Sequence, residues 1–546
     1  VQPIAAQASA VVGKALALAR LARTANADKK VAILFWNYPP GEKNLGASYM
    51  NLPSSLESTL DALRAAGYRT EARNAATLTR DLQRLLKPFY RPGAVATEID
   101  ALVRDGLADL LPLATYQQWF AGLPPPVQSG WVASVGQPGA SLFAVRRNGG
   151  VYFAVPRLQL GNVTILPQPP RSEPVDDGLL AKEKALYHST NAAPSHAYMA
   201  TYLWTRAQFQ ADALVHYGTH GTQEWLPGKE RGLAGTDYPL VALGDVPVVY
   251  PYIVDNIGEA VQTKRRGRAV NITHQTPPFA PAGLHSVLTR LHDDLHAWLA
   301  QDAGAVKEQL RTQVTATVVK ERIALDMGWT VQRIEKEFPS FITALHDHLH
   351  ELAQTAQPLG LHTFGRGADP HARLATVLMM LGAPFWEAAA THIDGHALEA
   401  DEAIVADFSR IAQTGPYQLL QRHVVEHAPT DTLPAALQSF LAQGQRWYAG
   451  LGAQGENRGL LAALQGRYIP TSYGGDPIKN PDSLPTGRNL YGFDPSRVPT
   501  QAAWTAGKEA LDKLVAAHAA KTGAVPTKFT FSLWSVETMR HQGLLE

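Results

Sequence analysis

The stretch from His216 to Lys229 contains the residue types best suited to chemistry in this chain. His216, His220 and Glu224 follow one another at intervals of four residues. Neutral imidazoles and carboxylates are the usual ligands of borderline divalent metal ions, and both groups also transfer protons. The spacing therefore predicts a metal or proton-transfer site, although three ordinary polar loop residues would give the same pattern.

Two backbone conformations bring these side chains together. On a helix they share one face, and at the end of a strand a tight turn gathers them. The turn is favoured, because Gly218 and Gly221 are poor residues for a helix interior. The neighbouring Tyr217 and Trp225 supply flat apolar surface for a planar ligand, and Lys229 is suited to pairing with a carboxylate.

A second basic segment, Lys264 to Arg268, is the strongest run of positive charge. A solvated helix face is the favoured interpretation, and Arg265 and Arg266 can instead pair with ligand carboxylates. The chain as a whole carries a formal charge of +1, which provides no field for attracting nucleic acid. We therefore expect no nucleic-acid partner.

Two histidine pairs occur farther along the chain. His292 and His296 share one face of a predicted helix, and so do His346 and His350. Taken one pair at a time, surface histidines are favoured over metal ligands.

A long loop from 468 to 499 combines turn residues with Arg488 and aromatic side chains such as Tyr491. Loops of this length inside compact domains are usually functional or disordered, and the aromatic residues favour an ordered one. We expect a ligand-closing or interface loop, with a structural surface loop as the alternative.

The elements that must position these residues indicate an α/β fold. The apolar run 31–36 and the segment 213–215 predict buried parallel strands, and 528–534 predicts a final strand after a helix over 501–519. We expect several doubly wound, parallel-sheet α/β domains with a mostly helical insertion. The predicted regions are 1–123 (α/β, strand 31–36), 124–283 (α/β, carrying the His/Glu loop), 284–465 (helical insertion) and 466–546 (long loop plus the start of a truncated C-terminal α/β domain).

Several classes are excluded or disfavoured. With no cysteine, the 546 residues cannot form disulfides, thiolate metal sites or iron–sulfur clusters. They contain no phosphate-binding Gly-x-x-x-x-Gly-Lys-Ser/Thr loop, no dinucleotide fingerprint and no serine-hydrolase elbow. The start does not resemble a signal peptide, and no apolar run approaches the roughly 18 residues that span a bilayer. We expect a cytoplasmic protein without a membrane span.

The loop from His216 to Lys229 closely resembles the signature of the large subunits of cobaltochelatase (CobN type) and magnesium chelatase. Other segments match the same family in order along the chain. They are 31–46, 244–247 with 250–254, 264–266 and 485–495. Family members normally exceed a thousand residues, so we expect a fragment or a shortened paralogue.

The resemblance implies insertion of a divalent metal into a tetrapyrrole. For the cobalt branch, which Trp225-Leu226 and the Tyr-Pro-Tyr segment at 250–252 resemble more, Co²⁺ enters hydrogenobyrinic acid a,c-diamide during cobalamin biosynthesis. ATP would be hydrolysed by partner subunits, an AAA+ ATPase and its companion with an integrin-like domain. The alternatives are a Mg²⁺-protoporphyrin chelatase subunit, a non-catalytic tetrapyrrole-binding module and a paralogue that removes metal.

The resemblance also suggests roles for single residues. His216, His220 and Glu224 would receive the metal, with Glu224 as the base and His220 as the second candidate for that role. Tyr217 and Trp225 would pack against the macrocycle. The other expected tetrapyrrole-binding residues are Lys229, Arg265, Arg266, Arg488 and Tyr491.

Overall fold

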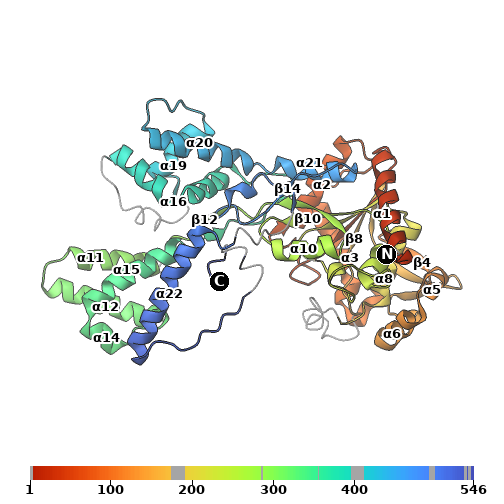
Figure 1. The fold of residues 1–546 in the computed structure, drawn as a ribbon, viewed down its shortest axis with the longest axis horizontal. Coiled ribbons are helices and arrows are strands. Elements are labelled where there is room, and N and C mark those ends of the chain that lie inside the picture. The colour runs from red at the N-terminus through yellow and green to blue at the C-terminus, as the bar shows by residue number, and fades with distance from the viewer. Residues whose placement is uncertain are drawn as a thin grey trace. The chain divides into compact units, whose positions relative to one another are not determined.

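The computed structural model in Figure 1 describes residues 4–173, 191–219, 221–284, 287–354, 356–394, 411–490, 498–533, 538 and 543–545. The chain divides into two compact units. The α/β unit comprises Val1–Thr276, Leu361–Gly367 and Leu451–Glu546, and the helical unit comprises Pro277–Gly360 and Ala368–Gly450.

A six-stranded sheet forms the centre of the α/β unit, in the order β11-β10-β9-β1-β8-β7. Its strands are β1 (Val31–Phe35), β7 (Leu158–Leu160), β8 (Val163–Pro167), β9 (Ala213–Tyr217), β10 (Val248–Ile253) and β11 (Ala269–His274). All neighbours pair in parallel except β7 with β8. Every residue of β1 is buried, as expected for a strand covered on both faces. The predicted α/β class is confirmed.

Helices cover both faces of this sheet (Figure 1). One face packs on α2 (Leu52–Ala65), α3 (Ala75–Tyr90) and α21 (Gln454–Leu464), and the other packs on α8 (His196–Leu203) and α9 (Tyr238–Leu243). The Asn51 side chain caps α2 by accepting a hydrogen bond from the Ser54 amide at 3.2 Å, as residues at this position commonly do. The remaining helices of this unit are α1 (Ala5–Arg23), α4 (Val95–Arg104), α5 (Leu113–Ala121), α6 (Pro125–Val135), α10 (Ile257–Arg265) and α22 (Gln501–Thr522).

Between β1 and β9 the chain switches from building one side of the sheet to building the other. From β1 the chain continues to β8 on one side, and from β9 it continues to β10 and β11 on the other. Open α/β sheets bind ligands outside the carboxyl ends of the strands at such a reversal. The β1–β9 register pairs Leu34 with His216, so the predicted His/Glu loop begins at this position.

The predicted boundary at 123/124 differs from the structure. β1 lies between β8 and β9 in one sheet, so the two predicted α/β regions share a core and belong to one unit. A separate antiparallel sheet of this unit contains the hairpin of β5 (Ala144–Arg147) and β6 (Gly150–Pro156), with β6 also paired with β4 (Ala108–Pro112). Its turn has positive φ at Asn148 and Gly149, as a tight two-residue hairpin turn requires.

The helical unit begins earlier than predicted, at Pro277, and ends at Gly450. Leu361–Gly367 and α21, both inside the predicted insertion, belong to the α/β unit. The α-helices in the described part of the unit are α11 (Val287–Ala300), α12 (Ala305–Lys320), α13 (Ile323–Asp326), α14 (Val331–Lys336), α15 (Phe338–Gln354), α16 (Pro370–Asp394), α19 (Gly415–Leu420) and α20 (Ala435–Gly450). A short antiparallel pair, β12 (Phe279–Pro281) with β13 (Ala356–Pro358), accompanies them.

Within the described residues, one segment is long and apolar enough to cross a membrane by length and composition alone. It is Pro370–Ile393 of α16, and 61% of its most apolar window is buried inside the protein. That burial is typical of a core helix.

The predicted C-terminal strand is wrong over its described part. Residues 528–533 form no strand, and Phe529, Phe531 and Leu533 are exposed, because no described strand lies beside them to pair with. The preceding long loop contributes the short parallel pair β14 (Thr471–Ser472) and β15 (Asn489–Leu490). The predicted helix over 501–519 is confirmed as α22.

Candidate functional site

His216 stands at the end of β9, on the face of the sheet that carries α8. It is 3% exposed, its Nε2 atom lies 3.1 Å from the Tyr202 hydroxyl, and its ring meets the Tyr250 ring edge-on at 5.1 Å. Burial lowers the pKa of His216 to about 3, so the imidazole is neutral at pH 7. Its Nδ1 atom has no hydrogen-bond partner among the described residues. The site therefore holds a neutral imidazole whose Nδ1 atom can donate a hydrogen bond or bind a metal ion, depending on the tautomer.

Glu224 lies in the one-turn helix η4 (Gln223–Trp225) and is also buried. Its Oε1 atom accepts a hydrogen bond from the Tyr250 hydroxyl at 3.1 Å. Tyr250 thus contacts both Glu224 and His216, so the structure brings these two predicted residues to one place. His220 lies outside the described residues, and among those described no further His, Asp or Glu joins the pair as a metal-binding group.

A hydrogen-bond network that the sequence analysis missed surrounds this pair. Gln168, directly after β8, donates from Nε2 to the hydroxyls of Tyr202 (2.6 Å) and Tyr198 (3.3 Å), and its Oε1 accepts from the Thr222 amide (2.9 Å). Burial raises the pKa of Tyr198 and Tyr202 well above the ordinary value, which keeps both hydroxyls protonated. The position of Gln168 at the carboxyl end of a buried strand is the signal that the sequence offers for it.

The two glycines of the loop are required by close approaches. A Cβ on Gly221 would lie 2.4 Å from the Tyr250 hydroxyl and 3.5 Å from Glu224 Oε2. Gly218 has φ +99°, and a Cβ there would lie 2.4 Å from that of Ala47. The predicted strand end and tight turn are confirmed, and the helical alternative is excluded.

Tyr217 lies on the opposite face of the sheet from His216, because successive side chains of a strand alternate. It is buried, and its hydroxyl contacts Thr59 Oγ1 at 2.6 Å and donates to the Ser55 carbonyl at 2.9 Å. Tyr217 is therefore buried in the core and presents no surface to a ligand, contrary to the sequence-based expectation, whereas Trp225 is partly exposed.

A second buried network occupies the Tyr217 face. Glu456 accepts hydrogen bonds from the Gln275 amide (2.9 Å), Thr486 Oγ1 (2.8 Å) and the Gly365 amide (2.7 Å), and its Oε2 lies 2.8 Å from His362 Nε2. Burial alone would raise the pKa of Glu456, but the adjacent His362 and these hydrogen bonds hold it below the ordinary value.

His274 connects this second network to the loop. Its ring stacks on His362, and its Nε2 atom lies 3.4 Å from Thr219 Oγ1. Burial lowers its pKa to about 4. The turn from Gly218 to Thr222 therefore lies between two buried polar networks, one on each face of the sheet.

Arg266 does not have the predicted role as a partner of ligand carboxylates. Its buried guanidinium donates to the backbone carbonyls of Glu224 (2.6 Å) and Gly228 (3.2 Å) and also contacts those of Leu226 and Lys229. The side chain is fully engaged in holding the loop, because the loop carbonyls have no strand partners.

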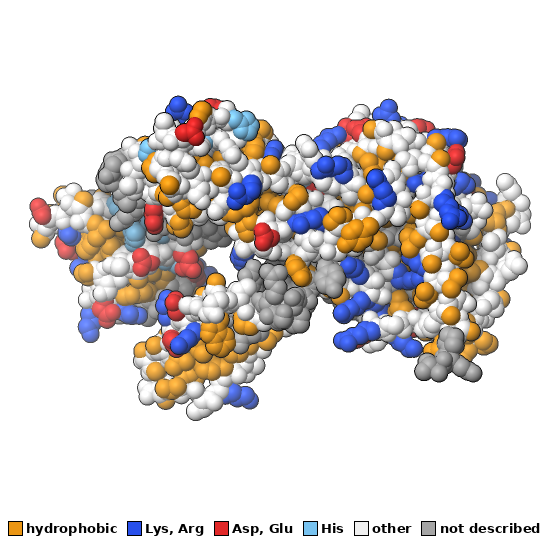
Figure 2. Space-filling model, turned by 45° about the horizontal axis from the view of Figure 1, so that its top comes forward, with side chains coloured by type: hydrophobic (Ala, Val, Ile, Leu, Met, Phe, Trp, Pro, Cys, Tyr) orange, Lys and Arg blue, Asp and Glu red, His pale blue; other side chains and the backbone are white. Residues whose placement is uncertain are grey.

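The other predicted cations differ in availability. Arg488 donates to the carbonyls of its own loop at Pro485 (2.9 Å) and Asp482 (2.7 Å), whereas Lys229 and Arg265 are exposed. Tyr491 lies outside the described residues. On the face shown in Figure 2, Lys and Arg side chains outnumber Asp and Glu over the α/β unit. Lys229 and Arg265 are thus the predicted cations left to meet a ligand.

Comparison with known proteins identifies the family to which the chain belongs. The model of the CobN/magnesium chelatase family matches residues 1–546, and the chain belongs to this family. An aerobic cobaltochelatase subunit CobN from Pseudomonas aeruginosa is 30% identical over 96% of the chain and 44% of its own length. A magnesium-chelatase subunit from Chlorobaculum parvum is 27% identical over 96% of the chain and 42% of its own length.

A solved structure agrees with the fold. The catalytic subunit of cobaltochelatase from Mycobacterium tuberculosis superposes with a TM-score of 0.79 at 29% identity, over 98% of this chain and 46% of that one. The chain spans less than half the length of these relatives. It is a member of a family of chelatase large subunits, and both the cobalt and the magnesium branches match it at similar identity.

Proposed function

We propose that this chain forms the metal-inserting, tetrapyrrole-binding part of an ATP-dependent chelatase, and that it inserts Co²⁺ into hydrogenobyrinic acid a,c-diamide in cobalamin biosynthesis. One observation carries the proposal. The neutral, buried His216 and the buried Glu224 meet through Tyr250 at the carboxyl edge of the sheet, where its strand order reverses.

The chemistry needs a metal acceptor and a base. Insertion transfers a divalent ion to the ring nitrogens while N–H protons leave the ring, one from a corrin and two from a porphyrin. His216, with His220 and Glu224, receives the ion, because a neutral imidazole keeps its lone pair at physiological pH. Glu224 takes a ring proton as its carboxylate becomes a carboxylic acid, with His220 the second candidate for this step.

Peripheral groups of the ring need cationic partners. Lys229 of the loop and Arg265, next to the loop anchor Arg266, are exposed cations, and the partly buried Trp225 provides an aromatic surface. These residues bind the ring carboxylates and one edge of the macrocycle in the proposal.

ATP hydrolysis is assigned to partner subunits, an AAA+ ATPase and its companion with an integrin-like domain. The 546 residues contain no phosphate-binding loop motif, and the relatives are named as subunits. Such an assembly would work in the cytoplasm. Cobalt is preferred to magnesium because Trp225-Leu226 and Tyr250-Pro251-Tyr252 resemble the cobalt branch more closely.

The test replaces Glu224 by Gln, which keeps the shape of the side chain and removes its basicity. Glu230→Gln is the matched control, because Glu230 is an exposed carboxylate in the same loop. Metal insertion is measured with the partner subunits, ATP and Co²⁺ or Mg²⁺, and ring affinity by absorbance titration with free-base corrinoid and porphyrin.

Loss of insertion in Glu224→Gln with retained ring binding supports the proposed role, and unchanged insertion rejects it. Faster insertion of Mg²⁺ into porphyrin would assign the chain to the magnesium branch. Ring binding without insertion by the unaltered protein would indicate a binding module, and release of metal from a metallated ring would indicate a dechelatase.

A further inference from the structure

The helical unit brings together the two histidine pairs that the sequence analysis interprets as separate surface pairs. We propose that His292 and His296 of α11 and His346 and His350 of α15 bind one divalent late transition-metal ion of the Zn²⁺, Co²⁺ and Ni²⁺ class. We refer to these four residues as the four-histidine site.

The four side chains converge within a small volume. One nitrogen from each ring lies within 4.8 Å of the corresponding nitrogens of the other three. His292 Nε2 lies 3.1 Å from His350 Nε2 and 3.2 Å from His296 Nε2. The rings of His346 and His350 stack with centroids 4.0 Å apart.

These distances match metal coordination. Imidazole nitrogens bind Zn²⁺ at about 2.0–2.1 Å, so two nitrogens on one tetrahedral ion are about 3.3–3.4 Å apart. The two Nε2 separations at His292 are within about 0.3 Å of that value. Small rotations of the partly exposed His296 and His346 side chains would complete the set.

A hydrogen-bonded histidine cluster explains the geometry less well. A ring nitrogen carries either one proton or one lone pair, and His292 Nε2 approaches two other nitrogens. One proton satisfies one of these contacts well, whereas a metal ion accepts a lone pair from each of the four rings.

The supporting helices hold the histidines in place. Each histidine adjoins a buried leucine of the same helix, and each pair has the i, i+4 spacing that places two ligands on one helix face. These leucines are Leu291, Leu295, Leu345 and Leu349, all part of one hydrophobic core. Metal sites in helix bundles are built in this way from facing helices.

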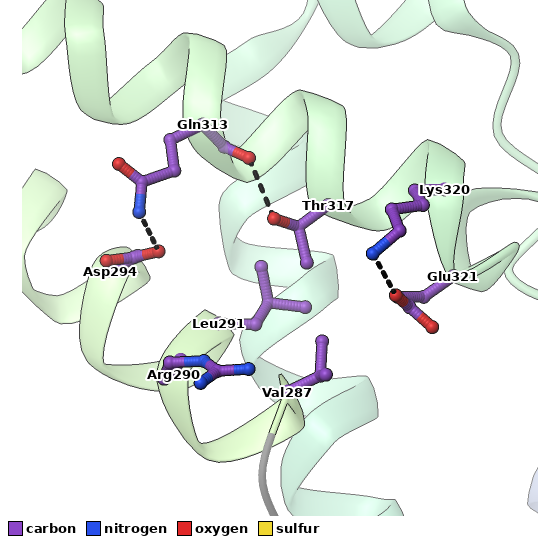
Figure 3. Close-up of a pocket in the computed structure, with 8 residues that line it drawn as sticks. All are labelled: Val287, Arg290, Leu291, Asp294, Gln313, Thr317, Lys320 and Glu321. Atoms are coloured by element: carbon purple, nitrogen blue, oxygen red, sulfur yellow. Dashed lines mark hydrogen bonds and ion pairs between the residues drawn. The ribbon is translucent and has the colours of Figure 1, made fainter.

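Contacts with α12 also fix α11. Figure 3 shows this side of the helix, where Gln313 of α12 donates to Asp294 of α11 at 2.9 Å. The cavity between them has a volume of about 160 Å³. Ligand pockets are usually larger than this.

The electrostatics suit a cation. The ligands are neutral when bound, so the ion keeps its charge, and Asp347 Oδ1 lies 3.6 Å from His346 Nδ1. A carboxylate next to a ligating histidine strengthens its donor character. No residue of this site belongs to the His216 loop, so the proposal stands independently of metal insertion.

The experiment titrates the whole metal-depleted protein with Zn²⁺ and with Co²⁺, following bound metal by equilibrium dialysis and the visible spectrum of bound Co²⁺. The variants are His296→Gln and His346→Gln, chosen because both residues are partly exposed and their loss leaves the core intact. His348→Gln is the matched control, since His348 lies on the same helix with similar exposure but outside the site.

We expect a saturable binding step for one ion at the four-histidine site, which each variant weakens by more than about tenfold, while the control does not change it. Zn²⁺ should also raise the melting temperature of the unaltered protein and not of the two variants. The titration is repeated in His216→Gln, where binding at this site should persist. No saturable binding by the folded protein, or equal affinity in both variants and the control, would overturn the proposal.

Discussion

His362 Nε2 and Glu456 Oε2 lie 2.8 Å apart in a buried polar contact, although 94 residues separate them along the chain. Most of the residues between them belong to the helical unit, whereas both partners belong to the α/β unit. The pair joins the short return segment Leu361–Gly367 to the start of α21. This contact therefore joins two segments of the α/β unit that lie before and after Ala368–Gly450, the second part of the helical unit.

Glu456→Gln should destabilise the α/β unit strongly. The change turns one oxygen of the carboxylate that accepts from Gln275, Gly365 and Thr486 into an amide donor, and a buried polar group left unsatisfied costs about 1–3 kcal/mol. Urea unfolding followed by circular dichroism measures the effect, with the exposed Glu71→Gln as control. Equal stability of the two variants would show that the pair does not hold the unit together.

Gly221→Ala should damage the site although it adds only a methyl group. The new Cβ would meet the Tyr250 hydroxyl at 2.4 Å, so Tyr250 must move away from Glu224. We expect a loss of about 1–3 kcal/mol in unfolding free energy, together with slower metal insertion. Gly235→Ala is the control in the same loop, because nothing lies within 4 Å of its Cβ. A Gly221→Ala protein as stable and active as Gly235→Ala would contradict the geometry.

Two adjacent arginines should behave differently. Arg266→Met leaves four loop carbonyls without their donor, and we expect it to cost about 2–4 kcal/mol of stability. Arg265 is exposed, so Arg265→Met should change stability by only about 0.5 kcal/mol or less. It should instead weaken the binding of a ring with peripheral carboxylates, measured by absorbance titration. The reverse assignment of the two effects would refute both roles.

Stability should fall on mild acidification. Burial lowers the pKa of His216 from 6.5 to about 3 and that of His274 from 6.5 to about 4. Below pH 6.5 the two histidines therefore bind protons in the unfolded chain but stay neutral in the folded protein. The stability from these groups is complete above about pH 6.5 and is lost progressively down to about pH 4 for His274 and about pH 3 for His216. From pH 7 to pH 5 each group should remove about 2 kcal/mol. Urea titrations of the unaltered protein and of His274→Asn measure this, and the variant should show the shallower pH dependence.

The sequence is sufficient to predict the local elements that position the site. The apolar run of β1, the glycine-rich turn after β9 and the helical insertion each carry their own periodicity. The prediction of His216 at a strand end is therefore correct. The pattern does not assign the sides of the strand, so it groups Tyr217 with His216 although the two residues point to opposite faces.

Contacts between distant segments cannot be predicted in the same way. The spacing of His292 with His296 shows a shared helix face, but only packing decides that this face meets α15. Likewise, nothing near Glu456 in the sequence indicates that it binds residues at 275, 362 and 486. In the sequence Arg266 is one of a run of basic residues and is therefore interpreted as a ligand-binding cation. Its contacts with the loop carbonyls depend on the folding of a segment about 40 residues earlier in the chain.

The division of the α/β unit into three sequence segments has a consequence for biosynthesis. When β11 and the His216 loop have been translated, Leu361–Gly367 and α21 have not yet been made. The Gln275 amide is therefore made before both halves of the helical unit, and His362 and Gly365 before its second half, so all three precede their partner Glu456. The helical unit, whose α11–α15 core is formed from residues close in sequence, can fold in that interval. The order of synthesis thus makes the closing of the sheet around its loop one of the last folding events.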